Sequence, residues 1–348
     1  MQLVAYGAQD IYLTGNPQIT FFKVVYRRHT NFAVESIEQT FNGTAAAGSK
    51  VSVTISRNGD LLSQVWVSTS VTSAHDAGNV GVSAAWGKID NVEVEVGGQV
   101  VDKQYGHWMK VWTDLTHNAD KSALLDRCLA NTGTNNDVGY IPLQFWFCRN
   151  PGLALPLIAL QYHEVKLNIT FGTDPGNVKV WCDYVFLDTD ERRRFAQVSH
   201  EYLIEQVQFS NKLSLGANRT QHELRFNHPV KELVWTCSDA NGVDKTVDDA
   251  LLQLNGHDRF KRREGKYFTT VQRYQHHSGS GNSLNSIPHV YSFALKPEEH
   301  QPSGTCNFSR IDNAVLNVNH KDVTSGNMCI YAVNYNVLRI MSGMGGLA

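Results

Sequence analysis

The chain contains a duplicated order of strand-like segments, and this repeat restricts its fold more than any other feature of the sequence. The segment Ile204–Phe209 resembles Ile37–Phe41. Three further pairs follow in the same order, at offsets of about 150 to 167 residues: Val94–Gln99 with Leu252–His257, Val165–Ile169 with Ala314–Val318, and Val180–Leu187 with Ile330–Leu338. Such a series predicts two copies of one fold with loops of unequal length.

Alternation of apolar and polar residues dominates the sequence from Phe32 onward, which is typical of half-buried antiparallel strands. Clear examples are Val51/Val53/Ile55, Val65/Val67, Val92/Val94/Val96, Val165/Leu167/Ile169/Phe171 and Leu252/Leu254. Turn signals such as Asn-Gly and Gly-Gly separate them. The main helical candidates are Lys103–Leu115 and Ser122–Ala130, and in the first of them Trp108, Val111, Trp112 and Leu115 recur at helical spacing, which predicts a core-facing stripe. We therefore expect an all-β fold of sandwich type with a few short helices.

A run of charged and hydroxyl residues, Asp188–Arg193, separates the two copies. We expect an N-terminal arm over residues 1–30, a first unit over 31–188, a linker over 189–200 and a second unit over 201–348. A cut or an insertion near Thr189–Arg193 is expected to leave both cores intact.

The composition excludes several classes of protein. The 348 residues contain 31 Lys and Arg against 33 Asp and Glu, spread evenly over both halves, so no specific nucleic-acid partner is expected. The six cysteines are widely spaced, which favours reduced, buried thiols. No secretory signal is evident, and the longest apolar run, Leu153–Leu160, is too short to span a bilayer. We expect a soluble protein from a reducing compartment.

No catalytic or metal-binding motif is present. A metal-binding β-sandwich enzyme would need a His-x-His pair on one strand, and the sequence has none. The adjacent His276 and His277 are interpreted as solvated loop residues. Asp188, Asp190 and Glu191 lack the spaced oxygens of a calcium loop and are interpreted as part of the linker. We expect no enzyme activity, no cofactor and no metal.

Two basic triplets, Arg192–Arg194 and Lys261–Arg263, lie beside carboxylates, which favours local ion pairs or packing against a neighbouring subunit over phosphate binding. Asn-x-Ser/Thr sequons occur at Asn42, Asn168, Asn218 and Asn307. Asn218 and Asn42 are the candidate glycosylation sites.

Long collinear stretches resemble the major capsid proteins of nucleocytoplasmic large DNA viruses, and in particular the algal, chlorella-virus-like branch of phycodnavirus type. The stretches that carry the resemblance are Gln2–Asp10, Leu13–Lys23, Tyr26–Arg28, Thr30–Phe32, Pro151–Leu167, Phe186–Phe209, Tyr291–Pro297, Gln301–Asn313 and Asn334–Leu347. They span nearly the whole chain, so the resemblance is far more specific than a short motif.

The resemblance implies a double jelly roll, that is, two consecutive eight-stranded antiparallel sandwiches, and a homotrimeric capsomer with six similar lobes that tiles an icosahedral shell. It implies that the protein is part of the virion capsid, assembled in the host cytoplasm. Its implied partners are neighbouring capsomers and minor or penton capsid proteins, with an internal membrane contacted indirectly. The arm would lie at the inner base of the capsomer, where Phe21, Phe22, Tyr26, Arg27 and Arg28 are the assembly candidates.

One departure from the family concerns loop length. The segments Asn211–Gln221 and Ser238–Asp248 are short where the family often has long outer loops, so no receptor or glycan role is carried over to them. An alternative function is a minor capsid or spike protein that binds host carbohydrate. A jelly-roll metalloenzyme is a third hypothesis.

Overall fold

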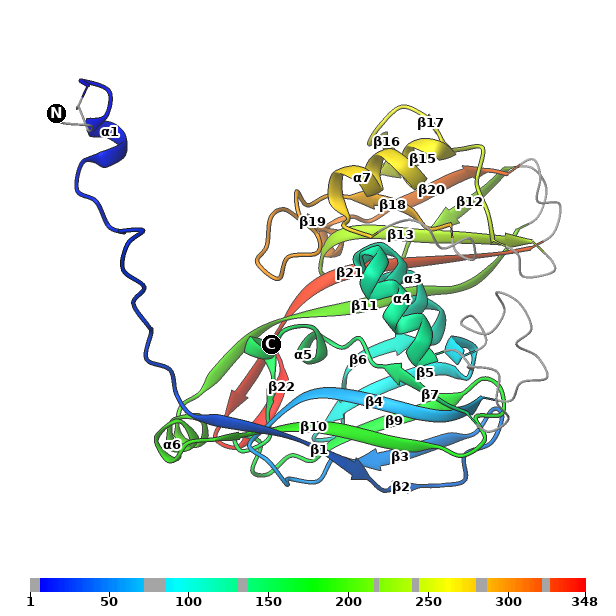
Figure 1. Cartoon of the computed structure of the whole chain (residues 1–348). Coiled ribbons are helices and arrows are strands. Elements are labelled where there is room, and N and C mark those ends of the chain that lie inside the picture. The colour runs from blue at the N-terminus through cyan, green and yellow to red at the C-terminus, as the bar shows by residue number, and fades with distance from the viewer. Residues whose placement is uncertain are drawn as a thin grey trace. The chain divides into compact units, whose positions relative to one another are not determined.

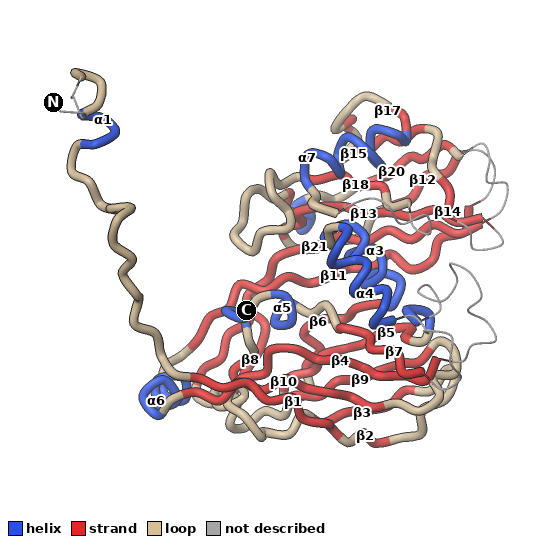
Figure 2. Tube along the Cα trace, in the orientation of Figure 1, coloured by secondary structure: helices blue, strands red, loops and turns tan. Residues whose placement is uncertain are grey.

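The computed structural model describes residues 7–71, 85–129, 137–215, 219–239, 244–279, 287–320 and 326–348. The chain divides into an arm, Met1–Asn31, and a body, Phe32–Ala348. The body is built almost entirely of antiparallel strands, with short helices between them (Figures 1 and 2). The arm contains one short helix, α1 (Ile11–Thr14).

Two sheets formed by the strands from β1 to β10 make a first sandwich. One sheet has the order β1 (Phe32–Gln39), β10 (Lys179–Leu187), β4 (Leu61–Val71), β7 (Asp137–Pro142), with β8 (Leu155–Pro156) also beside β4. The other has the order β2 (Phe41–Asn42), β3 (Lys50–Thr54), β9 (Val165–Phe171), β5 (Ile89–Val96), β6 (Gln99–Tyr105). Four of the five alternating segments named from the sequence lie in β3, β4, β5 and β9. The prediction of strands is therefore confirmed for these four segments.

Two further sheets, formed by the strands from β11 to β22, make a second sandwich. The first contains β11 (His200–Leu215), β21 (Gly326–Met341) and β13 (Pro229–Asp239), with β14 (Asp244–Lys245), β18 (His289–Ser292) and β19 (Cys306–Asn307) beside β13 and β22 (Met344–Leu347) beside β21. The second has the order β12 (Arg219–Glu223), β20 (Ala314–Asn319), β15 (Asp249–Leu254), with β16 (His257–Asp258) and β17 (Arg263–Glu264) beside β15.

The two sandwiches repeat one strand order. The order β1-β10-β4-β7 corresponds to β11-β21-β13-β18, and β3-β9-β5-β6 corresponds to β12-β20-β15 with β16 and β17. Each pair of segments matched in the sequence falls on corresponding strands; for example, Val165–Ile169 lies in β9 and Ala314–Val318 in β20. The duplication predicted from the sequence is therefore present in the fold.

The helices lie in the connections between strands. They are α3 (Gly106–Thr116), α4 (Ala119–Leu129), α5 (Trp146–Arg149), the 3-10 turns η2 (Pro151–Leu153) and η4 (Phe308–Arg310), α6 (Thr189–Gln197), the π-helical turn η3 (Tyr267–Val271) and α7 (Gln272–His276). The two helices predicted at 103–115 and 122–130 correspond to α3 and α4, with shifted ends.

The charged segment predicted as a linker forms helix α6. Asp188 caps it, since its carboxylate accepts a hydrogen bond from the Thr189 amide at 2.8 Å. Acidic residues fill the first turn and Arg194 the last, an arrangement that favours a helix through its dipole. Arg192 forms an ion pair with Asp60 of the first sandwich at 2.8 Å, in place of the expected pairs with its sequence neighbours.

Each sandwich has its own apolar core, but the first core also contains residues from the second repeat. The first core includes Ile204 from β11 and Leu338 and Ile340 from β21, whereas the second core contains only residues from β11 onward. The long strands β11 and β21 therefore run through the second sandwich and close the first with their other ends (Figure 1).

The cysteines are not uniformly buried. Cys182, Cys237 and Cys329 lie in the interior, as expected, but Cys128 is exposed on α4. The expectation of six buried thiols is therefore wrong for Cys128, because α4 buries only its end residue Leu129.

Candidate assembly surfaces and the junction between the sandwiches

The arm exposes its aromatic and basic side chains. Phe22 is 97% exposed and Phe21 and Tyr26 are nearly as open, while Arg27 and Arg28 are also exposed. The internal hydrogen bonds of the arm are local; for example, the Asp10 carboxylate accepts from the Gly7 amide and the Asp10 carbonyl accepts from the Thr14 hydroxyl. Exposed apolar side chains gain free energy when another surface covers them, and the assembly role of these five residues stays a prediction.

Of the two candidate glycosylation residues, only Asn42 lies in the described part of the chain. Asn42 is exposed at the end of β2, and Gly43 follows it with φ +113°, a turn conformation that favours glycine. Asn218 lies outside the described residues. Among the other sequons, Asn168 is buried and bonded to Ser52 and Glu95, which leaves it inaccessible to a glycan.

Helix α3 leaves the first sandwich and packs on the outer face of the second. It starts at Gly106, where a Cβ would lie 2.1 Å from the Ile89 carbonyl oxygen, so only glycine allows this close approach. Its apolar stripe, predicted from the sequence as a core-facing stripe, consists of Trp108, Val111, Trp112 and Leu115. These residues join Val207, Val234, Val290, Cys329, Tyr331 and Val333 of the second sandwich in a third apolar core. We call this packing the α3 junction.

A buried charge cluster lies beside the α3 junction. The Glu205 carboxylate of β11 contacts Arg149 Nη1 at 2.8 Å and Lys231 Nζ at 2.9 Å. Lys231 is fully buried, and its contact with Glu205 is ionic, without the alignment of a hydrogen bond. The rings of Trp112 and Tyr335 also face these cations, at 4.4 Å from Arg149 Cζ and 5.4 Å from Lys231 Nζ respectively. The cluster thus ties α5 of the first sandwich to β11 and β13 of the second.

His277 forms the second polar contact of the junction. Its Nε2 lies 3.0 Å from the Glu232 carboxylate and its Nδ1 lies 3.1 Å from that of Glu298. Burial alone would lower the pKa of His277, but the two carboxylates outweigh it and raise the pKa to about 9. The imidazole is therefore charged at neutral pH. The interpretation of His277 as a solvated loop residue is wrong, because the loop folds back over β13.

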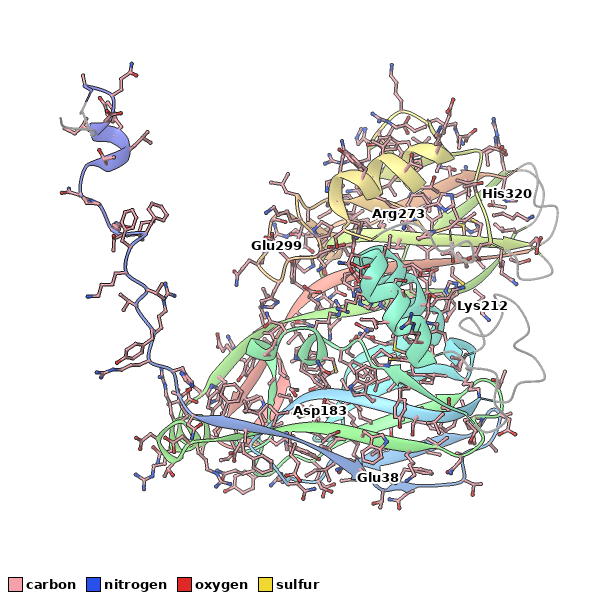
Figure 3. The ribbon with its side chains drawn as sticks, viewed as in Figure 1. Glu38, Asp183, Lys212, Arg273, Glu299 and His320 are labelled. Carbon is pink, nitrogen blue, oxygen red and sulfur yellow. The ribbon has the colours of Figure 1, made fainter. Side chains whose placement is uncertain are left out.

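The same loop holds the end of α3. Arg273 donates from Nη2 to the Asp114 carbonyl at 3.3 Å (labelled in Figure 3), and the Gly279 amide donates to Leu115 O at 2.7 Å. The Ser278 hydroxyl donates to Thr116 O at 3.0 Å. These bonds satisfy carbonyls that a helix end leaves without intrahelical partners. The contact is with the protein's own backbone, so it serves a structural purpose.

The described residues hold no group of three or more His, Cys, Asp or Glu side chains placed to bind a metal ion. Within the same ranges, no helix is both long and apolar enough to cross a membrane. The second basic triplet is engaged locally, since Arg262 pairs with Asp249 and Arg263 lies over the Tyr267 ring.

Family models match the chain over nearly its whole length. A model described as major capsid protein N-terminus matches residues 20–188, and one described as large eukaryotic DNA virus major capsid protein matches residues 191–246 and 239–346.

Known relatives show the same relationship. A major capsid protein of Pyramimonas orientalis virus is 52% identical and aligns with 100% of this chain and 98% of its own. One from Paramecium bursaria Chlorella virus 1 is 44% identical over 100% and 98% of the two chains. The first alignment extends over 392 positions against 348 residues here, so that relative carries at least 44 positions without a counterpart.

Solved structures agree with these sequences. A quasi-atomic model of the PBCV-1 virus capsid superimposes with a TM-score of 0.84 and 40% identity, over 94% of this chain and 99% of the other. The Faustovirus major capsid protein has the same fold at a TM-score of 0.74 and 12% identity, over 97% and 94% of the chains. Together with the duplicated sandwiches, these matches show that the chain belongs to the major capsid proteins of large eukaryotic DNA viruses, which are structural, non-enzymatic virion proteins with a double jelly-roll fold.

Proposed function

We propose that three copies of this chain form a cyclic homotrimer that tiles the viral shell as a pseudo-hexameric capsomer. The observation that carries the proposal is the repeat of one strand order in two sandwiches of a single chain. Three such chains present six similar lobes, and a threefold object with six similar lobes can occupy a hexagonal lattice.

The partners follow from this role. Trimers contact neighbouring trimers, and the exposed aromatic and basic residues of the arm are suited to contacts with a neighbouring capsomer or a minor or penton capsid protein. An internal membrane would be contacted only through such proteins, and assembly takes place in the host cytoplasm.

The domain boundaries belong to the same proposal: an arm over 1–30, jelly rolls over 31–188 and 201–348, and a connection over 189–200. The separate sheets of β1–β10 and β11–β22 support this division, as do family matches that end at residue 188 and begin at 191.

Size-exclusion chromatography with light scattering tests the trimer, and negative-stain microscopy tests the capsomer shape. We expect a mass near three chains of 38.9 kDa and particles of hexagonal outline. A stable monomer across micromolar concentrations would contradict the proposal.

A further inference from the structure

The two repeats of the fold differ at three matched positions of their cores. In the first sandwich, Val51 and Val53 of β3 pair in register with Ile169 and Leu167 of β9. Phe171 is the last residue of β9. The two valines and the phenylalanine belong to the first core, and none is more than 1% exposed. Apolar side chains therefore fill these three positions in the first sandwich.

The second sandwich has polar residues at the same three positions. Thr220 and His222 of β12 pair in register with Val318 and Leu316 of β20. The repeat aligns these two β20 residues with the β9 partners of the two valines, so Thr220 and His222 take the places of the valines. His320 directly follows β20 and takes the place of the phenylalanine. Both imidazoles are buried. Because the first repeat holds apolar residues here, the fold itself does not require polar ones.

The three polar residues form one hydrogen-bonded chain. His222 Nε2 lies 2.9 Å from Thr220 Oγ1, and His320 Nε2 lies 3.2 Å from the same oxygen. A hydroxyl has one hydrogen to donate, and a neutral imidazole has one N–H group and one nitrogen that accepts. The chain is satisfied when one imidazole donates to Thr220 Oγ1 and the other accepts from it. At least one of the two Nε2 atoms must therefore be unprotonated.

A proton on each imidazole breaks this pattern. Both Nε2 atoms then carry hydrogen, so the hydroxyl hydrogen of Thr220 has no acceptor in the chain. Two positive charges would also face one another across a single oxygen in the protein interior, where charged groups lose their solvation. Burial and the neighbouring His320 both lower the pKa of His222. The folded chain therefore resists the second proton.

The charged residues of the same sheet do not compensate a charge on His222. Thr220 and His222 pair with core residues of β20, so the alternate positions of β12 and β15 lie on the outer face of the sheet. The charged residues at these alternate positions are Arg219, Glu223 and Asp249. Asp248, in the connection before β15, is exposed to solvent, and its amide donates to the Asn319 carbonyl at 2.9 Å.

The opposite sheet contributes titratable groups that are neutral. Cys237 of β13 belongs to the second core, and His289 of β18 is stacked on Trp235 in that core. Burial raises the pKa of Cys237 to about 12 and lowers the pKa of His289 to about 4. The core residues of β11 and β21 are apolar, for example Leu215 and Met328. Protonation of both imidazoles would thus place two charges beside an apolar core.

The hydrogen-bonded chain fastens an edge strand. Among the described strands, β12 lies at the end of its sheet and pairs only with β20. Thr220 and His222 belong to β12, whereas His320 (labelled in Figure 3) follows β20, so their contact adds a side-chain tie to the backbone pairing. Loss of β12 would uncover the edge of β20 and its core residues Leu316 and Val318.

We propose that Thr220, His222 and His320 form an acid-sensitive latch, which holds β12 on the second sandwich at neutral pH and releases it when both imidazoles are protonated. We call these three residues the histidine latch. Because the pKa of His222 is lowered from 6.5, the stability that the latch contributes is complete above pH 6.5 and is lost as the pH falls below this value. The released sheet presents an unpaired strand edge, to which another strand can add. The inference concerns a single chain and does not depend on the proposed trimer.

Native-state hydrogen exchange, followed by mass spectrometry, tests the histidine latch on the full chain. Protection is corrected for the intrinsic effect of pH on the exchange rate. We expect the protection of the β12 amides to fall by about 10-fold or more between about pH 7.5 and about pH 5, because the released imidazoles take up protons. Strand β3 is the internal control, since it has the same place in the first sandwich and contains no histidine. Its protection should change by less than about twofold.

The first sandwich supplies the matched variant. Thr220→Val/His222→Val/His320→Phe gives the second repeat the three residues of the first, which fill a core without a titratable group. We expect the β12 amides of this variant to be equally protected at both pH values. His222→Gln is a second variant, in which the amide oxygen accepts from the Thr220 hydroxyl while a protonated His320 donates to it. This variant should also lose the pH dependence.

Three results would overturn the inference. The first is a wild-type β12 whose protection is the same at both pH values. The second is an equal loss of protection in β12 and β3, which would indicate general unfolding in acid. The third is a pH dependence that persists in His222→Gln, since it would then come from other groups. His222→Gln decides the matter even if the triple variant does not fold.

Discussion

At the scale of single residues, the junction between the sandwiches depends on buried charges that compensate one another. Glu205 faces two cations, and its side chain is only 8% exposed. Removing one partner of such a cluster lowers the free energy of unfolding strongly, because the remaining charges stay buried away from solvent and no longer have a counterion. The stability of the junction is therefore sensitive to Glu205 in particular, since without it Arg149 and Lys231 would repel each other.

We expect Glu205→Gln to lower the free energy of unfolding by about 3–5 kcal/mol, the range typical of a broken buried ion pair. Urea denaturation followed by circular dichroism measures the change. As a control, Glu299→Gln removes an exposed pair with Lys296 and should change stability by less than about 1 kcal/mol. Equal effects of the two substitutions would contradict the buried role of Glu205.

His277 makes stability depend on pH in the alkaline range. Its pKa is about 9 in the folded chain and near 6.5 when unfolded. A raised pKa contributes stability that is complete below pH 6.5 and is lost as the pH rises through 9. Between pH 6.5 and pH 9 we expect the free energy of unfolding to fall by on the order of 3 kcal/mol. The double variant Glu232→Gln/His277→Gln should unfold with a flatter dependence on pH over this interval; an unchanged profile would exclude His277 as its source.

At the scale of elements, α3 is the helix that unites the sandwiches, and α4 beside it is nearly unburied. The sequence predicted both helices and the apolar stripe of α3 from the spacing of Trp108 and Trp112. It did not predict that the stripe packs on the other sandwich, because helical periodicity identifies the buried side but not what covers it.

Removing one apolar side chain from α3 should lower the free energy of unfolding much more than the same change on α4. Trp108→Ala is expected to cost about 3–5 kcal/mol, as is usual for a buried aromatic, and to expose the face of β13 and β21. Leu124→Ala on α4 should cost less than about 0.5 kcal/mol in the monomer. Thermal denaturation of both variants measures the difference, and similar melting temperatures would argue against the α3 junction.

Two other elements show why sequence reasoning succeeded or failed. The sequence of helix α6 contains a helix signal, because Asp188 is an N-cap residue and acidic residues precede basic ones. The high density of charged residues favoured the prediction of a linker instead. The position of His277 has no local signal, since its carboxylate partners come from residues 232 and 298. Strands were predicted well because alternation is a local property.

At the scale of the whole molecule, the body, residues 32–348, is one compact unit in which the two repeats share core residues. The first core borrows Ile204, Leu338 and Ile340 from the second repeat. The α3 junction places residues of the first repeat on the second in return. Each repeat alone would expose an apolar surface that the other covers.

We expect residues 32–198 expressed alone to aggregate or remain partly unfolded, because the surface that should contact β11 and β21 is left in water. Co-expression with residues 199–348 should restore a soluble complex, and a flexible insertion at Thr189–Arg193 should leave both cores folded. Solubility and co-purification of the fragments provide the measurement. A soluble, cooperatively folding fragment 32–198 would show that the borrowed residues contribute little.

The path of β21 also sets the order in which the protein can be completed during its synthesis. Leu338 of β21 emerges from the ribosome 151 residues after Leu187, the last residue of β10, although both strands contribute residues to the first core. Domains usually fold as they are made, beginning with the N-terminal one. Here the earlier sandwich must wait for the later one, so the nascent chain keeps an apolar surface exposed until the second repeat has been translated. This delay gives chaperones and neighbouring nascent copies a defined interval in which to bind.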